Sequence, residues 1–83
     1  MYTVYILKSG KDKKRYIGMT KDIERRQNEH YNGNVKSTKN RRPIKLIYTE
    51  GFEIKKDAML REKFFKTGKG REFLKNIEKR RVV

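Results

Sequence analysis

The sequence of residues 2–18 is YTVYILKSGKDKKRYIG, and it predicts a β-hairpin. Its first six residues are aromatic, β-branched or aliphatic, which is typical of a strand. A polar and basic loop, residues 9–14, follows, and Arg15–Gly18 forms a second short strand that can pair with the first. We expect Gly18 to mark a position where a side chain is not tolerated.

One helix and one further strand are predicted after the hairpin. Thr20 or Asp22 can cap a helix that extends to about Tyr31, and Gly33 is a candidate for the left-handed residue that ends it. A basic loop then covers residues 34–42. The third strand is expected over residues 44–49, with alternate apolar residues on one side, and a turn is expected at residues 50–51.

The last third of the chain is predicted to be helical. One helix runs from about Ile54 to Lys66 and stops at Gly68. A second helix follows Gly70 with its apolar residues on one side, and the tail, residues 79–83, is expected to fray. The order β-β-α-β-α-α predicts an α+β fold, in which a small three-stranded antiparallel sheet is flanked by three helices within a single domain of residues 1–83.

The composition points to a polyanionic partner. The chain has 24 Lys and Arg residues against 10 Asp and Glu residues, which gives a net charge of +14. Nucleic acid is the commonest partner of such a chain, because bound cations release condensed counterions. The basic runs around Lys39, Arg41 and Lys63 are predicted to contribute to this attraction.

Other classes of site are excluded by the residues that are missing. A chain without Cys has no disulfides, thiolate zinc sites or Cys nucleophiles, and a single His excludes a multi-His metal site. No apolar run approaches the roughly 20 residues that a membrane span needs, and the N-terminus does not resemble a signal peptide. We therefore expect no membrane partner and a cytoplasmic protein.

The first helix is predicted to turn polar residues inward. Ile23 is its only aliphatic residue and should mark the core side, with His30 within about 20° and Arg26 within about 60° of it. Taken singly, His30 is more simply a hydrogen-bonded core histidine, and Arg26 an arginine whose stem covers the core edge. Taken together, the two residues favour these structural roles and a functional site about equally.

The second helix places a carboxylate near its apolar side. Ile54, Ala58 and Phe65 define the inward stripe, and Glu62 lies about 40° from Ala58. A buried carboxylate needs a partner, which could be Arg26, or Arg61 or Lys66 on the same helix, or a metal ion. Mg²⁺ often uses one or two protein carboxylates, with waters and phosphate oxygens as its other ligands. The hairpin adds two tyrosines, Tyr5 and Tyr16, that can both face the first helix.

Two tripeptides, Val4-Tyr5-Ile6 and Tyr16-Ile17-Gly18, occur with the Arg26…His30 pair and a later helical glutamate, Glu62. In this order and spacing they resemble the GIY-YIG endonuclease family. The resemblance extends from Tyr2 to about Ile77. The chain is similar to small stand-alone bacterial domains that resemble the N-terminal nuclease domain of the cutting component of the bacterial excinuclease.

The resemblance implies hydrolysis of DNA phosphodiester bonds with one divalent metal, Mg²⁺ or Mn²⁺, and a role in DNA repair or recombination. It implies that Glu62 holds the metal, that Arg26 binds the scissile phosphate, and that Tyr5 or Tyr16 activates the attacking water. The tyrosine needs help to act as a base near neutral pH, which Arg26, the field of the metal or a proton acceptor such as His30 could give. The resemblance also matches Asn76 to an asparagine of the family, and we expect Asn76 to contact nucleic acid. The lysine that the excinuclease version carries three residues after the second tyrosine is Met19 here.

Two further hypotheses remain from the sequence. The charge alone would serve a nucleic-acid-binding module with little or no catalytic activity. A structural protein, for instance one associated with the ribosome, would use Arg26 and Glu62 for folding and not for chemistry.

Overall fold

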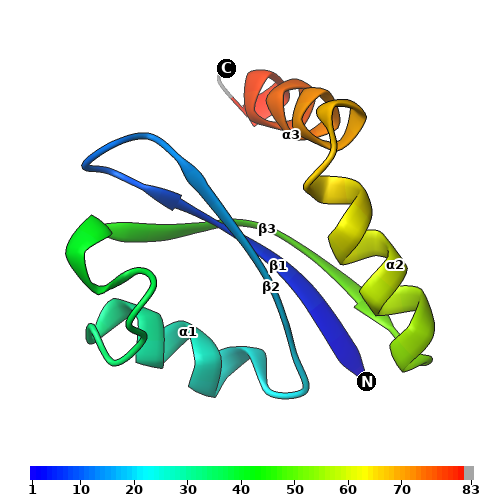
Figure 1. Ribbon diagram of the computed structural model, residues 1–83, viewed down its shortest axis with the longest axis horizontal. Coiled ribbons are helices and arrows are strands. Elements are labelled where there is room, and N and C mark those ends of the chain that lie inside the picture. Colours follow the sequence, from blue (N-terminus) through cyan, green and yellow to red (C-terminus); the bar gives the residue numbers. More distant parts are fainter. Residues whose placement is uncertain (82–83) are drawn as a thin grey trace.

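A computed structural model describes residues 1–81 of the chain (Figure 1). The predicted order of elements and the three-stranded antiparallel sheet are confirmed. A short 3₁₀ helix, η1, lies in the predicted basic loop, and residues 82–83 of the tail lie outside the described part. The elements are β1 (Tyr2–Ser9), β2 (Arg15–Thr20), α1 (Ile23–Tyr31), η1 (Lys39–Arg41), β3 (Ile44–Phe52), α2 (Lys55–Phe65) and α3 (Gly68–Arg81).

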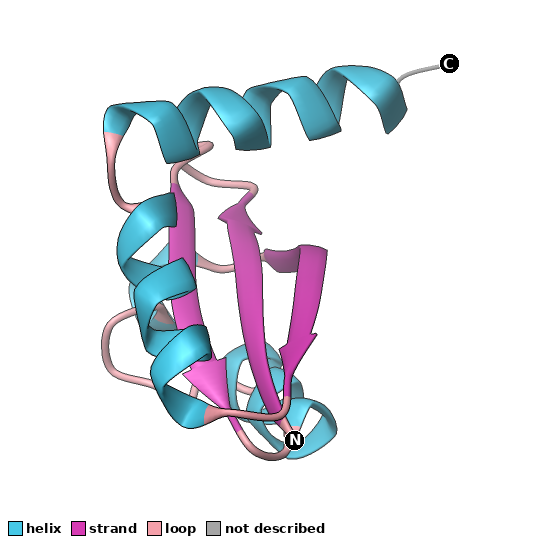
Figure 2. Ribbon diagram, turned by 90° about the vertical axis from the view of Figure 1, so that its right-hand side faces the viewer, coloured by secondary structure: helices cyan, strands magenta, loops and turns pink. Residues whose placement is uncertain are grey.

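The central strand of the sheet is covered on both faces. The strand order is β2-β1-β3, and α1 lies on one side of the sheet while α2 and α3 lie on the other (Figures 1 and 2). Val4 and Ile6 pack with α2 and α3 residues, whereas Tyr5 and Leu7 belong to a second cluster with Ile44. Because alternate side chains of a strand point to opposite faces, two covered faces require an apolar run without interruption in β1.

The predicted alternation in β3 is wrong beyond Leu46. The register shifts at this point, because Ile6 pairs with Tyr48 and Leu7 pairs with Leu46, which leaves Ile47 as an extra residue. This β-bulge reverses the side on which later residues lie. Leu46 therefore packs on the cluster of Tyr5, whereas Ile47 and Tyr48 pack on the opposite cluster. The turn predicted at residues 50–51 is also absent, since β3 continues to Phe52.

The ends of α1 follow the prediction. The side chain of Asp22 accepts a hydrogen bond from the Arg25 amide, and Gly33 has a positive φ of 78° just beyond the helix. Both features are ordinary ways to satisfy the free groups at helix ends.

The junction of α2 and α3 differs from the prediction. Gly68 begins α3 and does not stop α2, because the Thr67 hydroxyl accepts a hydrogen bond from the Gly70 amide at 3.2 Å and caps the new helix. A side chain on Gly70 would collide with the Phe65 Cα at 2.5 Å, so the glycine permits a sharp change of direction between the helices. The prediction that Ile54 lies on the inward stripe is wrong, since its side chain is 60% exposed at the start of α2.

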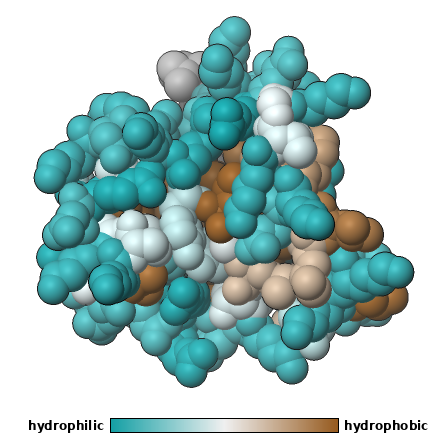
Figure 3. Space-filling model, in the orientation of Figure 1, coloured by the Kyte–Doolittle hydropathy of each residue, from teal (hydrophilic) through white to brown (hydrophobic). Residues whose placement is uncertain are grey.

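Ion pairs hold α3 against the hairpin. Glu78 lies 3.2 Å from Lys8 of β1 and 2.5 Å from Arg15 of β2. Within residues 1–81, each helix is too short or too polar to span a lipid bilayer. The face in Figure 3 is mostly hydrophilic, as the charge of +14 leads one to expect.

Candidate active site

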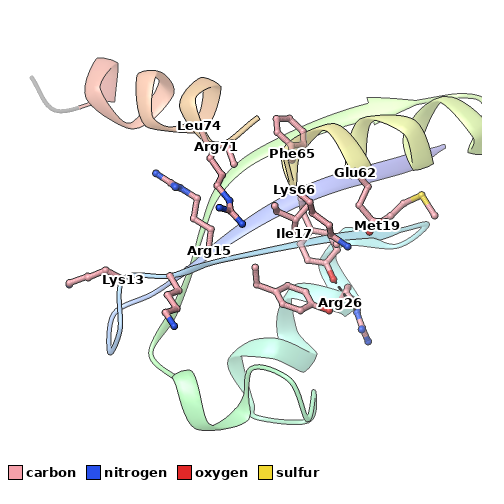
Figure 4. A pocket seen from close by; sticks show the side chains of 14 residues that line it. Lys13, Arg15, Ile17, Met19, Arg26, Glu62, Phe65, Lys66, Arg71 and Leu74 are labelled. Atoms are coloured by element: carbon pink, nitrogen blue, oxygen red, sulfur yellow. Dashed lines mark hydrogen bonds between the residues drawn. The ribbon is translucent and has the colours of Figure 1, made fainter. Parts of the chain in front are cut away.

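A cleft of about 860 Å³ lies along the edge strand β2. Its apolar lining includes Ile17 of β2, Phe65 of α2 and Leu74 of α3, and α1 contributes to the lining from the other face of the sheet (Figure 4). Tyr5, Tyr16, Arg26 and Glu62 all line it. Arg26 and Glu62 approach from opposite faces of the sheet and both reach the cleft at the edge of β2.

A chain of hydrogen bonds runs from the cleft into the interior. Arg26 Nε donates to the Tyr5 hydroxyl oxygen at 3.3 Å, and that hydroxyl is 3.1 Å from His30 Nε2. His30 Nδ1 is in turn 2.7 Å from Thr38 Oγ1. Tyr5, His30 and Thr38 are buried, so the polar atoms of these three side chains depend on protein partners, whereas Arg26 reaches the cleft.

The local sequence explains why these side chains meet. Gly18, paired with Tyr5 across the hairpin, leaves the space that the Tyr5 ring fills: a Cβ there would lie 2.9 Å from Tyr5 Cε2 and closer still to its hydroxyl. Tyr16 lies beside this ring, with its own centroid 6.4 Å from that of Tyr5 and 5.1 Å from that of His30. The inward position predicted for His30 is confirmed.

Arg26 is fixed by two partners and keeps one nitrogen for a ligand. Its Nε donates to Tyr5, and its Nη1 lies 3.3 Å from Glu29 Oε1 one turn along α1. Among residues 1–81, its Nη2 has no hydrogen-bond partner. A guanidinium that is held by two of its nitrogens presents the third in a defined direction, which suits a phosphate oxygen.

The pKa values around the cleft shift in directions that follow from this arrangement. Burial raises the pKa of Tyr5, the hydrogen bond from Arg26 opposes that rise, and the negative charge of Glu62 adds to it. The hydrogen bond to Tyr5 raises the pKa of Arg26. Burial, and then the positive charge of Arg26, lowers the pKa of His30. Near neutral pH, His30 is therefore a neutral base in contact with a protonated tyrosine.

Glu62 differs from the other half-buried carboxylates. Glu29, Glu50 and Glu78 each form an ion pair, whereas Glu62 has no hydrogen-bond or ion-pair partner among residues 1–81. Arg61, which the sequence offered as a partner for Glu62, binds Glu50 at 2.7 Å instead. The carboxylate of Glu62 is therefore available to a ligand in the cleft.

The cleft also contains cations that were not among the predicted site residues. Besides Arg26, its lining includes basic side chains from the hairpin loop, β2, α2 and α3: Lys13, Lys14, Arg15, Lys66 and Arg71. The helix periodicity could not identify Lys66 and Arg71, since their approach to β2 depends on the bend between α2 and α3.

Of the predicted nucleic-acid contacts, Arg26 lines this cleft and the other four lie outside its lining. Arg41 binds Asp12 at 3.2 Å, and Lys39 lines a separate shallow pocket beside Tyr31. Lys63 lies on the outer side of α2, and Asn76 is exposed on α3. Their contacts with nucleic acid stay predictions.

Comparison with known proteins identifies the family. A model of the GIY-YIG catalytic domain matches residues 1–78. The chain belongs to the GIY-YIG family. It is 45% identical over 75 residues to a UPF0213 protein of Staphylococcus saprophyticus, covering 89% of this chain and 90% of the relative. It is 46% identical over 67 residues to a UPF0213 protein of Clostridium perfringens, covering 80% of this chain and 71% of the relative.

A solved structure agrees with this assignment. The solution NMR structure of a UPF0213 protein from Bacillus halodurans superposes with a TM-score of 0.58 at 34% identity, covering 93% of this chain and 85% of that one. The GIY-YIG domain indicates a nuclease, which acts on nucleic acid, and nucleases of this family generally use divalent metals. The names of the UPF0213 relatives add no specific activity.

The residues of the cleft fit a divalent metal. Among residues 1–81, no three or more His, Cys, Asp or Glu side chains gather to hold an ion by themselves. A single free carboxylate is nevertheless a usual contribution to Mg²⁺, whose remaining ligands are waters and substrate phosphate oxygens. Glu62 provides such a carboxylate in a cleft whose other charges attract phosphate.

Proposed function

We propose that this protein is a metal-dependent endonuclease that hydrolyses DNA phosphodiester bonds. The observation that carries the proposal is the free carboxylate of Glu62 in one cleft with Arg26, Tyr5 and Tyr16. We propose that residues 1–83 act as a single nuclease domain with these groups as its active site. Roles in DNA repair or recombination remain predictions from the family resemblance.

Each side chain would have a distinct part in hydrolysis. The Nη2 of Arg26 would bind the scissile phosphate and stabilise the charge that grows on it as water attacks. Tyr5 or Tyr16 would accept a proton from that water, and neutral His30 would take up the proton in turn. Glu62 would hold the metal, Mg²⁺ or Mn²⁺. The chemistry that such an ion supplies when bound is Lewis-acid stabilisation of the leaving 3′ oxygen.

Cleavage of supercoiled plasmid in Mg²⁺ or Mn²⁺ tests the proposal. We expect Glu62→Gln to reduce nicking to background and Arg26→Ala to reduce it by about 100-fold, since each removes a group that acts on the transition state. Glu72→Gln is the matched control, because Glu72 is exposed and does not line the cleft, and because this substitution changes the net charge by the same amount as Glu62→Gln.

DNA binding in EDTA separates catalysis from attraction. Glu62→Gln should bind DNA at least as tightly as the wild type, because it removes a negative charge from a basic cleft. Equal nicking by wild type and both site variants would show that a contaminant cuts the plasmid. Salt-sensitive binding without cleavage in any metal would favour a nucleic-acid-binding module instead.

A further inference from the structure

The segment between α1 and η1 brings a hydroxyl to the buried side of His30. Thr38 is fully buried, its amide donates to the Val35 carbonyl at 3.2 Å, and its Oγ1 lies 2.7 Å from His30 Nδ1. The chain folds back onto α1 just before, where the Asn34 amide donates to the Glu29 carbonyl at 2.8 Å. Thr38 is therefore placed by the backbone and does not touch the cleft.

Two arrangements of hydrogens would satisfy these distances. In the first, Tyr5 O–H donates to His30 Nε2 and His30 Nδ1–H donates to Thr38 Oγ1. In the second, Thr38 O–H donates to Nδ1 and His30 Nε2–H donates to the Tyr5 oxygen. The two differ in the tautomer of His30, which decides whether the imidazole can accept a proton from Tyr5.

Arg26 favours the first arrangement. Its Nε–H always donates, so one lone pair of the Tyr5 oxygen is already taken. In the first arrangement every hydrogen points away from the guanidinium, and the bonds Arg26 to Tyr5 to His30 to Thr38 run head to tail and polarise one another. In the second, the hydrogens of Arg26 and His30 converge on the Tyr5 oxygen next to a positive charge, which is less favourable.

We propose that Thr38 is a positioning residue that holds His30 in the Nδ1–H tautomer and so makes Tyr5, and not Tyr16, the general base. This inference rests on the nuclease function proposed above. Tyr5 is the tyrosine whose hydroxyl is bonded to His30, whereas Tyr16 contacts the imidazole through its ring.

The proton balance follows from this assignment. The water oxygen bonds to phosphorus, and the bond between phosphorus and the 3′ oxygen breaks. A water proton passes to the Tyr5 oxygen while the Tyr5 proton passes to His30 Nε2, so Tyr5 remains neutral. His30 becomes an imidazolium whose Nδ1–H stays bonded to Thr38, and the 3′ oxygen takes a proton from solvent.

The single histidine of the chain makes the tautomer measurable without ambiguity. In ¹⁵N-labelled protein at about pH 7.5, the two imidazole nitrogens give well-separated signals for the protonated and unprotonated states. We expect the Nδ1–H tautomer in the wild type and in Thr38→Ser, which keeps the hydroxyl. In Thr38→Val, which has a similar shape but no hydroxyl, the population of the Nε2–H tautomer should increase. An Nε2–H tautomer in the wild type would overturn the proposal. This measurement does not depend on whether a variant folds.

Cleavage provides the second measurement. We expect kcat to fall by about 10-fold to 100-fold in Thr38→Val with KM little changed, and to be largely restored in Thr38→Ser. Equal tautomer populations and equal kcat in wild type and Thr38→Val would refute the role of Thr38. If the wild type does not cleave DNA at all, the nuclease proposal fails while the tautomer measurement still decides whether Thr38 orients His30.

Discussion

Substitution of Gly18 by alanine is expected to damage the active site more than the fold. Gly18 lies against the Tyr5 ring, and its missing side chain is what allows that ring to occupy the space beside β2. A Cβ at this position would lie 2.9 Å from Tyr5 Cε2. The ring must then retreat by about 0.5 Å at this carbon, and by more at the hydroxyl end, to reach ordinary carbon contact.

This movement acts on hydrogen bonds that are already near the upper limit of hydrogen-bond length. The Tyr5 hydroxyl is already 3.1 Å from His30 and 3.3 Å from Arg26, so its displacement is expected to lengthen at least one of these bonds in a buried setting. Overpacking costs about 1–3 kcal/mol, and an unsatisfied buried hydroxyl costs about 1–3 kcal/mol. We expect a loss of about 2–6 kcal/mol in the free energy of unfolding, to be compared with the roughly 5–15 kcal/mol of a domain of typical stability.

Urea unfolding and plasmid cleavage together check this expectation. Gly68→Ala is the matched control, since no atom lies within 4 Å of a Cβ added there, at the start of α3. Alanine at that position should stabilise the protein by about 0.5–1 kcal/mol and leave cleavage intact. If Gly18→Ala proved as stable and as active as Gly68→Ala, the close packing of Tyr5 on Gly18 could not be what positions the Tyr5 hydroxyl.

Two further predictions concern stability. Because the folded state lowers the pKa of His30, the unfolded chain binds more protons below about pH 6.5, so the free energy of unfolding should be greatest above that pH and fall as the pH drops through it. Urea unfolding between pH 7.5 and 5.5 measures this slope, and an equal slope in His30→Gln would contradict the assignment. Glu78→Gln removes the partner of Lys8 and Arg15 and should cost about 1–2 kcal/mol. Glu72→Gln, exposed on the same helix, should change the free energy of unfolding by less than about 0.5 kcal/mol, and an equal loss in both variants would refute a structural role for the Glu78 ion pairs.

The fold could be predicted because its main signals are local. An apolar run in residues 2–7, glycines beside turns and a capping aspartate at Asp22 each identify an element without reference to the rest of the chain. The errors occurred where tertiary packing decides. The bulge at Ile47 depends on pairing between strands about 40 residues apart in sequence, and the start of α3 at Gly68 depends on the close approach of Gly70 to Phe65.

The candidate site was predictable only in part. Helix periodicity placed His30 inside, because one aliphatic residue, Ile23, was enough to orient α1. Thr38 gave no such signal, since it lies in a polar loop with no period, and its contact with His30 exists only because the chain folds back onto α1. The sequence shows that Lys66 is positively charged, but it does not show that this side chain lines the cleft.

The charge of Glu62 is the strongest argument that the cleft binds a ligand. A chain with a surplus of 14 positive charges does not lack partners for a carboxylate, and Lys63 and Lys66 are close to Glu62 in sequence. The other half-buried carboxylates, Glu50 and Glu78 among them, each pair with a cation, whereas Glu62 pairs with none in the described part of the chain. A carboxylate without a partner contributes little to folding, so Glu62→Gln should leave the free energy of unfolding nearly unchanged. A loss of cleavage in this variant would then report on the chemistry of the cleft and not on the stability of the fold.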